Sequence, residues 1–459
     1  MPVVLTEKIS SGQSQYGREP SQTSAVSRSW ILFIINLPLL AEVVRKYVYQ
    51  RDSIFFGMAM IALLSLLALL FQSKTRVLKS LPLGVWFTIL AFYSWAFFNE
   101  VVASRSLIVF MIGLGTMFLP VTYMLVSNIY FQQGEGAIHR VFLCVNCWLA
   151  LILAIALLQI YLGRDHALTT YGLGATGIGD YSVGGRTLKW LFRPTSIFTH
   201  TGKFGQALFC LVLFKWSYLA VTKNPIKRIW KLSICLDVLA VVVSGQRANF
   251  IFLCISVCLL LLYKASREGG RTIARLLGYS LIGIIALAMV SLQPDLMFSS
   301  TSDLIFDRLL SGFYDIPHRL QGNFILPFSA VVDKYLIFGE GLGHFTLGAV
   351  NYGGVIVFKT VDMPGLGENS WIRMIAEVGA IGTILYLMIL FQLLRLALRS
   401  VVSRRRQDNE VVALFFAIWL GSIMLWANTH DVFGNIIVTS LAFALGGGVL
   451  HMKKYHEGS

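Results

Sequence analysis

Charged residues are scarce in this chain. Only 13% of its 459 residues are charged, whereas 56% are hydrophobic and the mean hydropathy is +0.70. An ordinary soluble domain has about a quarter charged residues. This scarcity excludes an ordinary soluble protein and indicates a chain that lies largely within a lipid bilayer.

Cysteines are few, and their positions do not suit a disulfide framework or a metal site. None of them falls in the long polar segments, where a disulfide framework would be expected. The pair Cys144-x-x-Cys147 has no second ligand pair, so helix packing is the better interpretation. All the cysteines lie within or beside apolar runs, at Cys144, Cys147, Cys210, Cys235, Cys254 and Cys258.

The sequence also shows no cleavable signal peptide. Residues 1–28 are polar and rich in Ser and Gln, without a short apolar core and a cleavage site. We therefore expect residues 1–28 to form a polar cytoplasmic tail and the first membrane span to act as the insertion signal.

Long apolar runs, by contrast, are abundant. Runs such as Ile54–Phe71 and Leu277–Leu292 approach the ~20 residues that cross ~30 Å of hydrocarbon. The sequence predicts an all-α polytopic membrane protein, with residues 29–459 forming a single membrane domain of about 12 transmembrane helices. The expected helix centres are residues 38, 63, 92, 117, 152, 212, 237, 256, 284, 385, 418 and 442.

Basic residues indicate the orientation of the chain. The net charge of +15 collects in short loops, which the positive-inside rule places in the cytoplasm. Both termini are then cytoplasmic, and nucleic-acid binding is not expected. Arg45, Lys46 and Arg51 are an exception, because they would lie outside. The loops that agree hold Lys74, Arg76, Lys79, Lys223, Lys227, Arg228, Lys231, Lys264, Arg267, Arg271, Arg275, Arg395, Arg399 and Arg404–Arg406.

Two long segments lie outside the cytoplasm in this orientation, residues 163–196 and residues 293–369. The second is a long polar excursion that is too rich in aromatic and aliphatic residues for a disordered loop, so we expect it to be functional. Within it the spacing predicts short interfacial helices over Asp303–Phe313 and Phe324–Leu336. Gly339–Gly343 then predicts a turn.

Three motifs lie on this outer side. The first is Arg193-Pro194-Thr195-Ser196-Ile197-Phe198-Thr199-His200, where a new span begins. The second is Ser244-Gly245-Gln246-Arg247-Ala248-Asn249, an arginine in a tight turn between two apolar runs. The third is Gly339-x-Gly-x-Gly343, followed by Glu368-Asn369-Ser370-Trp371 and Gly379-Ala380-Ile381-Gly382-Thr383.

In their order, spacing and common side, these motifs resemble the O-antigen ligase and O-antigen polymerase superfamily of bacterial envelope glycosyltransferases. The resemblance covers roughly residues 190–400. It implies an enzyme of the bacterial inner membrane whose active site faces the periplasm. The ligases of this superfamily typically carry a histidine where this chain has Glu368, and the second motif reads Gln-Arg-Ala rather than Ser-Arg-Gly. The resemblance therefore favours a polymerase of O-antigen or exopolysaccharide over a ligase that acts on a lipid A-core acceptor.

The chemistry of such a transfer suits arginine. Nucleotide sugars are absent outside the cytoplasm, so the glycan donor would be linked to a polyprenyl diphosphate, which gains negative charge as the glycosidic bond breaks. Guanidinium groups are permanently charged forks that match phosphate oxygens. We predict Arg193 and Arg247 as catalytic residues and Arg319 as a third, substrate-binding arginine. The external loops contain no Asp-x-Asp, so we expect neither a metal nor a cofactor.

An acceptor hydroxyl must also lose its proton, and a carboxylate can take it. Glu368, where a transmembrane helix begins, is the predicted catalytic base. Asn369 is predicted either to orient substrate or to cap that helix. His200 is the last predicted substrate-binding residue, with an ordinary polar contact as the alternative.

Structural alternatives apply to the charged residues as well. Arg193 could extend to lipid headgroups, and Arg319 could pair with Asp315 on the surface. An idle charge at Arg247 would be costly in its tight turn.

The expected partners are a polyprenyl diphosphate-linked glycan donor, a saccharide acceptor, the lipid bilayer, and other polysaccharide assembly and export proteins. A transporter or flippase of lipid-linked saccharides is the alternative from another functional class. It would need charged or broken helices near the bilayer midplane.

Overall fold

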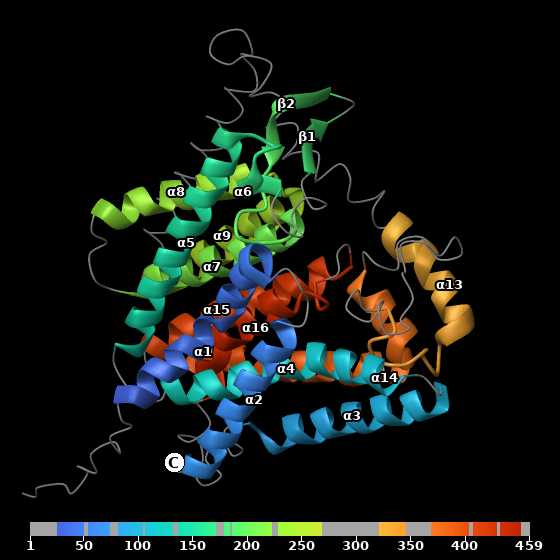
Figure 1. Cartoon of the computed structure of the whole chain (residues 1–459). Helices are drawn as coiled ribbons and strands as arrows, with labels where there is room; N and C mark the ends of the chain where they lie inside the picture. The colour runs from blue at the N-terminus through green and yellow to red at the C-terminus, as the bar shows by residue number, and fades with distance from the viewer. Residues whose placement is uncertain are drawn as a thin grey trace, which may run out of the picture.

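The computed structural model is helical almost throughout (Figure 1). It describes residues 25–49, 54–73, 81–103, 106–131, 136–170, 179–183, 186–222, 228–268, 321–345, 369–403, 407–428 and 432–450. The helices before residue 179 are α1 (Ala25–Val44), the π-helix η1 (Arg45–Tyr49), α2 (Ile54–Ser73), α3 (Leu83–Ala103), α4 (Leu107–Phe131), α5 (Ala137–Leu162) and the short α6 (Ala167–Thr170). Those after it are α7 (Thr201–Val221), α8 (Arg228–Ser244), α9 (Arg247–Glu268), η4 (Gln321–Ile325), α13 (Leu326–Tyr335), α14 (Ser370–Ser403), α15 (Gln407–Trp426) and α16 (Ile436–Gly446).

The helices lie where the membrane spans were predicted, but fewer of them are long enough to count as candidate spans. Every predicted centre except residue 284 falls within a helix, and residue 284 lies outside the described residues. Among the described residues, 7 helices are long and apolar enough to cross a membrane. Shorter apolar helices run over Ser233–Ser244, Glu410–Trp426 and Ile436–Leu450. The structure is therefore that of a polytopic membrane protein, and the count of twelve spans is not confirmed.

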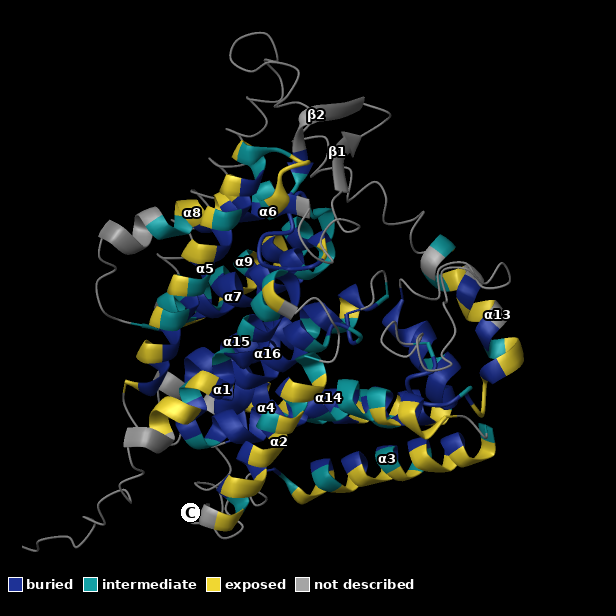
Figure 2. Cartoon of the chain, viewed as in Figure 1, coloured by how far each residue is buried: buried dark blue, intermediate teal, exposed yellow. Residues whose placement is uncertain are grey.

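A buried helical core is surrounded by helices with apolar outer faces. α16 packs mainly on α4, and α14 packs mainly on α3, whereas α15 packs on both α14 and α7. α7 is the most enclosed of the candidate spans, with 78% of its apolar window buried. α3 instead exposes a row of large apolar side chains along one face, which suits a helix in contact with lipid tails (Figure 2). These exposed side chains include Leu83, Phe87, Leu90, Phe97, Phe98, Val101 and Val102.

The described residues 321–345 of the segment 293–369 pack onto α14 through α13. The helix predicted over Phe324–Leu336 is confirmed as α13, preceded by η4, whereas Asp303–Phe313 lies outside the described residues. The predicted turn at Gly339–Gly343 is also confirmed, with positive φ at Gly341 and Gly343.

This glycine turn joins a break in α14. Gly379 has φ 71° within the helix, which leaves nearby backbone groups without their helical partners. The N–H of Glu340 donates to the carbonyl of Ala376 (2.8 Å), and the N–H of Gly341 donates to that of Glu377 (3.0 Å). The break and the turn thus supply each other's hydrogen bonds, and they fix α13 against the outer half of α14.

A small β-hairpin is an addition that the all-α prediction did not include. β1 (Gly179–Val183) and β2 (Arg186–Arg193) pair antiparallel, with Val183 opposite Arg186 and an irregularity between Asp180 and Tyr181. The sequence between the strands is Gly-Gly, which favours a two-residue hairpin turn. The first external segment was predicted as a loop because the surrounding apolar spans dominate its sequence pattern.

Two glycines of α4 provide a matched test of how the glycine turn at Gly339–Gly343 packs on α4. A Cβ on Gly113 would lie 2.5 Å from the backbone nitrogen of Gly343, whereas a Cβ on Gly115 would meet nothing within 4 Å. We predict that Gly113→Ala lowers the thermal unfolding temperature in detergent by several degrees, because overpacking costs about 1–3 kcal/mol. Gly115→Ala should leave it unchanged or raise it, since alanine favours helix. Equal effects of the two substitutions would contradict the observed contact.

Candidate functional site

The Arg193–His200 segment, called here the RPTS loop, connects β2 to α7 and lies inside the protein. Pro194 to Thr199 are all buried. Ser196 has φ 52°, a left-handed conformation that is uncommon for a residue other than glycine. Such a conformation persists only where surrounding contacts enforce it, and it is often found at functional sites.

Helix α5 supplies part of that enforcement. The Ser196 N–H donates to Oε1 of Gln159 (2.8 Å), and the Ser196 hydroxyl donates to the carbonyl of Ile152 (2.7 Å). Nε2 of Gln159 donates to the Ser196 carbonyl at 3.2 Å. Every polar group of Ser196 is therefore bonded, so this residue can be buried in its left-handed conformation without an unsatisfied backbone group.

The π-helix η1 supplies further contacts to the RPTS loop. Nζ of Lys46 donates to Oγ1 of Thr195 (2.7 Å) and to the carbonyl of Ser196 (2.5 Å). The Tyr47 hydroxyl donates to the same carbonyl at 3.0 Å. π-helical turns are rare in proteins, and those that occur often lie at functional sites. Here the turn directs a buried lysine into the RPTS loop.

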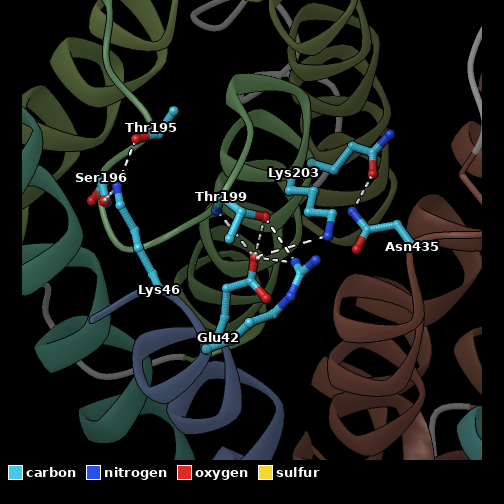
Figure 3. A network of polar contacts seen from close by, with 9 residues as sticks. Glu42, Lys46, Thr195, Ser196, Thr199, Lys203 and Asn435 are labelled. Carbon is cyan, nitrogen blue, oxygen red and sulfur yellow. Dashed lines mark hydrogen bonds and ion pairs between the residues drawn. The ribbon is translucent and has the colours of Figure 1, made fainter. Parts of the chain in front are cut away.

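A second set of contacts joins Glu42 of α1 to the end of the same loop (Figure 3). Oε1 of Glu42 accepts the Thr199 N–H (3.1 Å) and the Thr199 hydroxyl (3.0 Å). Two cations lie near this oxygen, Nη1 of Arg45 at 3.6 Å and Nζ of Lys203 at 3.9 Å. Arg45 also donates to the Thr199 hydroxyl at 2.9 Å.

These contacts account for the exception to the positive-inside pattern. Arg45 and Lys46 do not lie in an open loop but are buried, with 9% and 0% exposure. In the sequence Arg45 and Lys46 were an exception to the orientation pattern, and no role was predicted for Glu42 or Lys203. The available signal was the co-occurrence of Glu42, Arg45 and Lys46 at the end of one apolar helix, where buried charges require partners.

Two of the predicted residues, Arg193 and His200, lie at the ends of the RPTS loop. Arg193 is half-buried at the end of β2. His200 keeps part of its surface exposed and caps α7, because its Nδ1 accepts the Gly202 N–H at 2.9 Å. Desolvation by the surrounding protein, and then the positive charges of Lys203 and Arg193, lower the pKa of His200. A deprotonated Nδ1 agrees with its role as the acceptor of this cap.

Arg247 is the first residue of α9, directly after the tight turn that the sequence predicted. α8 ends at Ser244, and Gly245 has φ 59°. This turn packs on the first turn of α7, where a Cβ on Gly205 would lie 2.7 Å from Cγ of Gln246. Arg247 is therefore held next to the helix that follows the RPTS loop.

The starts of α14 and α16 lie in the same region. Oδ1 of Asn369 accepts the N–H groups of Trp371 (3.0 Å) and Ile372 (3.1 Å), so Asn369 caps α14, as the capping alternative predicted. Oγ of Ser370 accepts the N–H of Val432 at 2.8 Å, ahead of α16.

Nδ2 of Asn435, the N-cap residue of α16, donates to Oε1 of Gln206 in α7 (2.6 Å) (Figure 3). The N-termini of α7, α9, α14 and α16 thus converge. Each helix N-terminus carries roughly half a positive charge. Arg45, Lys203, Arg193 and Arg247 add positive charge to the same region, and Glu42 offsets part of it.

The other two predicted site residues, Glu368 and Arg319, lie outside the described residues. Their roles stay predictions. Comparison with protein-family models finds no family that matches this chain, and comparison with curated proteins finds no significant match.

Lys46 offers a direct test of the buried loop. We predict that Lys46→Met lowers the thermal unfolding temperature in detergent, because the buried Thr195 hydroxyl oxygen loses its donor. A buried acceptor left without its donor costs about 1–3 kcal/mol. Lys334→Met is the control, since that lysine is exposed on α13 and a surface change should stay within about 0.5 kcal/mol. Unfolding temperatures that fall equally would show that Lys46 does not hold the loop.

Proposed function

We propose that this chain is a glycosyltransferase of the bacterial inner membrane, of the polysaccharide polymerase type. It moves a glycan from a polyprenyl diphosphate to an acceptor sugar hydroxyl on the periplasmic side. One observation carries the proposal. Arg193, which the sequence motifs selected, lies near Lys203, and Lys203 and the buried Arg45 both approach Glu42. Arg247, the second selected arginine, follows a turn that packs on α7 at Gly205, two residues after Lys203.

A lipid diphosphate is the ligand whose chemistry suits this region. Its phosphates lie at the membrane surface while its polyprenyl chain stays in the bilayer, so a polytopic protein can reach both parts. Arginine forks and helix N-termini each bind phosphate oxygens. They act here in a partly buried site, where charge interactions are stronger than in water. The arrangement thus favours a negatively charged leaving group at this position.

In the proposed reaction the acceptor oxygen attacks the anomeric carbon of the donor. The bond between that carbon and the diphosphate oxygen breaks, and the diphosphate leaves with the electron pair. Arg193 and Arg247 stabilise the charge that develops on it. Glu368 takes the proton of the acceptor hydroxyl. Arg319 contributes a further positive charge toward the donor.

The identity of the residue before Asn369 is the reason for proposing a polymerase rather than a ligase. Glu368 stands where the ligases of the resembling superfamily typically carry histidine, and the acceptor then becomes a growing chain rather than a lipid A-core. A polymerase gives a ladder of chain lengths, whereas a ligase gives a single product.

Arg247→Ala tests the enzymatic proposal. We predict that this variant inserts into the membrane but forms less than roughly a hundredth of the polymer, because removal of one stabilising donor costs about a hundred-fold or more in rate. Arg395→Ala, which removes an exposed arginine from the opposite half of α14, should leave polymer formation unchanged. Both are measured by gel separation of polymer from cells with equal amounts of inserted protein. A full ladder from Arg247→Ala would refute the assignment.

A flippase of lipid-linked saccharides is the second candidate, and two features favour it. α14 is broken at Gly379, and a buried ion pair joins Lys215 of α7 to Asp237 of α8 (2.7 Å). The described spans therefore contain a break in the helical backbone and a buried pair of opposite charges. Transporters place broken helices and charged groups within the bilayer.

Reconstituted protein supplied with labelled lipid-linked glycan separates the two candidates. We predict new glycosidic bonds, detected as products longer than the substrate by mass spectrometry. Translocation of unchanged substrate across the vesicle membrane, without longer products, would favour the flippase and overturn the enzyme.

A further inference from the structure

Among the described residues, two buried ionic networks differ in how completely their charged groups are hydrogen-bonded. The first joins Lys215 and Asp237. Nζ of Lys215 lies 2.8 Å from one carboxylate oxygen of Asp237 and 2.7 Å from the other. Nε1 of Trp216 donates to the second oxygen (2.9 Å), and Lys215 also donates to the carbonyl of Ser233 (3.2 Å). Both charged side chains are almost fully buried, at 2% and 3% exposure. This is a closed, structural pair.

The second network, around Glu42, is open. Its ion pairs are long, at 3.6 Å to Arg45 and 3.9 Å to Lys203. Oε2 of Glu42 has no hydrogen-bond partner among the described residues, although the side chain is 0% exposed. A buried carboxylate oxygen without a partner is costly, and structural ion pairs avoid it. The geometry of Glu42 therefore does not have the form of a stabilising pair.

The two cations of this network are also placed to receive a ligand. Nζ of Lys203 lies 5.9 Å from the ring centroid of Phe55, and Cζ of Arg45 lies 4.8 Å from it, so both approach the same ring. The side chain of Lys203 is 27% exposed, whereas Glu42 is fully enclosed. An anion that arrives from outside thus meets Lys203 before it reaches the carboxylate. Lys203 and Arg193 both act on His200, which places the network next to a proposed catalytic arginine.

We propose that Arg45 and Lys203 bind the diphosphate of the lipid-linked donor, and that Glu42 holds these two cations in place until the diphosphate takes them over. The proposal rests on the function proposed above and adds residues that the sequence motifs did not contain. Arg45 and Lys203 grip the diphosphate together with Arg193. Glu42 is a positioning residue, because it acts through the cations.

The difference in negative charge explains why the diphosphate can replace Glu42 as the partner of Arg45 and Lys203. Without ligand, two cations near a protein interior repel each other, and one carboxylate offsets that repulsion. A diphosphate ester carries more negative charge than one carboxylate and offers more acceptor oxygens, so it competes successfully for both cations. Glu42 keeps its hydrogen bonds from Thr199 throughout, which leaves the RPTS loop in place. The carboxylate therefore weakens ligand binding while it maintains the shape of the empty site.

The test is binding of undecaprenyl diphosphate to the full chain in lipid nanodiscs, measured as a dissociation constant. We predict that Lys203→Met weakens binding by roughly ten-fold, the effect of losing one charge-assisted hydrogen bond. Lys334→Met removes an exposed lysine from α13 and should leave the constant unchanged, which controls for general attraction of anions. Lys203 is partly exposed, so its replacement should not prevent folding.

Glu42→Gln separates this proposal from a purely structural role. It keeps the side-chain shape and the acceptor for Thr199 but removes the competing charge, so binding should become tighter while a structural role would leave it equal or weaker. If Lys203→Met matches Lys334→Met, or Glu42→Gln fails to tighten binding, the proposal is overturned. A wild-type protein that does not bind undecaprenyl diphosphate would instead refute the proposed function itself. If Arg247→Ala weakens binding but Lys203→Met does not, the proposed function is supported and the subsite at Arg45 and Lys203 is refuted.

Discussion

The burial of the RPTS loop is the constraint on which the rest of the site depends. A non-helical segment can lie inside a membrane protein only if its backbone groups find partners within the protein. Gln159 of α5 and Lys46 of η1 provide them at Ser196, and Glu42 provides them at Thr199. These contacts fix where β2 ends and α7 begins, and hence where Arg193, His200 and Lys203 lie. The contacts that bury the RPTS loop therefore also position the cations around it.

A second constraint acts on α14. Its break at Gly379 leaves carbonyls that the glycine turn satisfies from one side and that Trp95 and Asn99 of α3 satisfy from the other. The carbonyl of Val378 accepts from Nε1 of Trp95 at 2.7 Å. The outer part of α14 is thereby held rigidly, and its N-terminus, capped by Asn369, joins the starts of α7 and α16. Backbone groups freed by a break must find partners within the protein when they lie in a bilayer, and the contacts from α3 and the glycine turn provide them.

Local patterns predicted much of this structure. Apolar run length located the helix centres, glycine predicted the turns at 245 and 339–343, and alternating polarity predicted α13. The hairpin was missed because its turn signal, Gly184-Gly185, is short beside long apolar runs. The Glu42 and Lys46 contacts could not be predicted, because they join residues separated by 157 and 149 positions in the chain. Charge patterning alone made these residues look like an orientation anomaly, whereas only tertiary packing reveals what they bind.

The most direct test of the account is the side of the membrane on which the RPTS loop opens. His200 is exposed at one end of α7, and Arg395 is exposed toward the opposite end of α14. In a background whose native cysteines are replaced, His200→Cys and Arg395→Cys can be labelled with a membrane-impermeant maleimide in intact spheroplasts. The account predicts that His200→Cys is labelled from outside and that Arg395→Cys is labelled only after permeabilisation. The reverse pattern would place the cations in the cytoplasm and contradict a periplasmic transfer from lipid diphosphate.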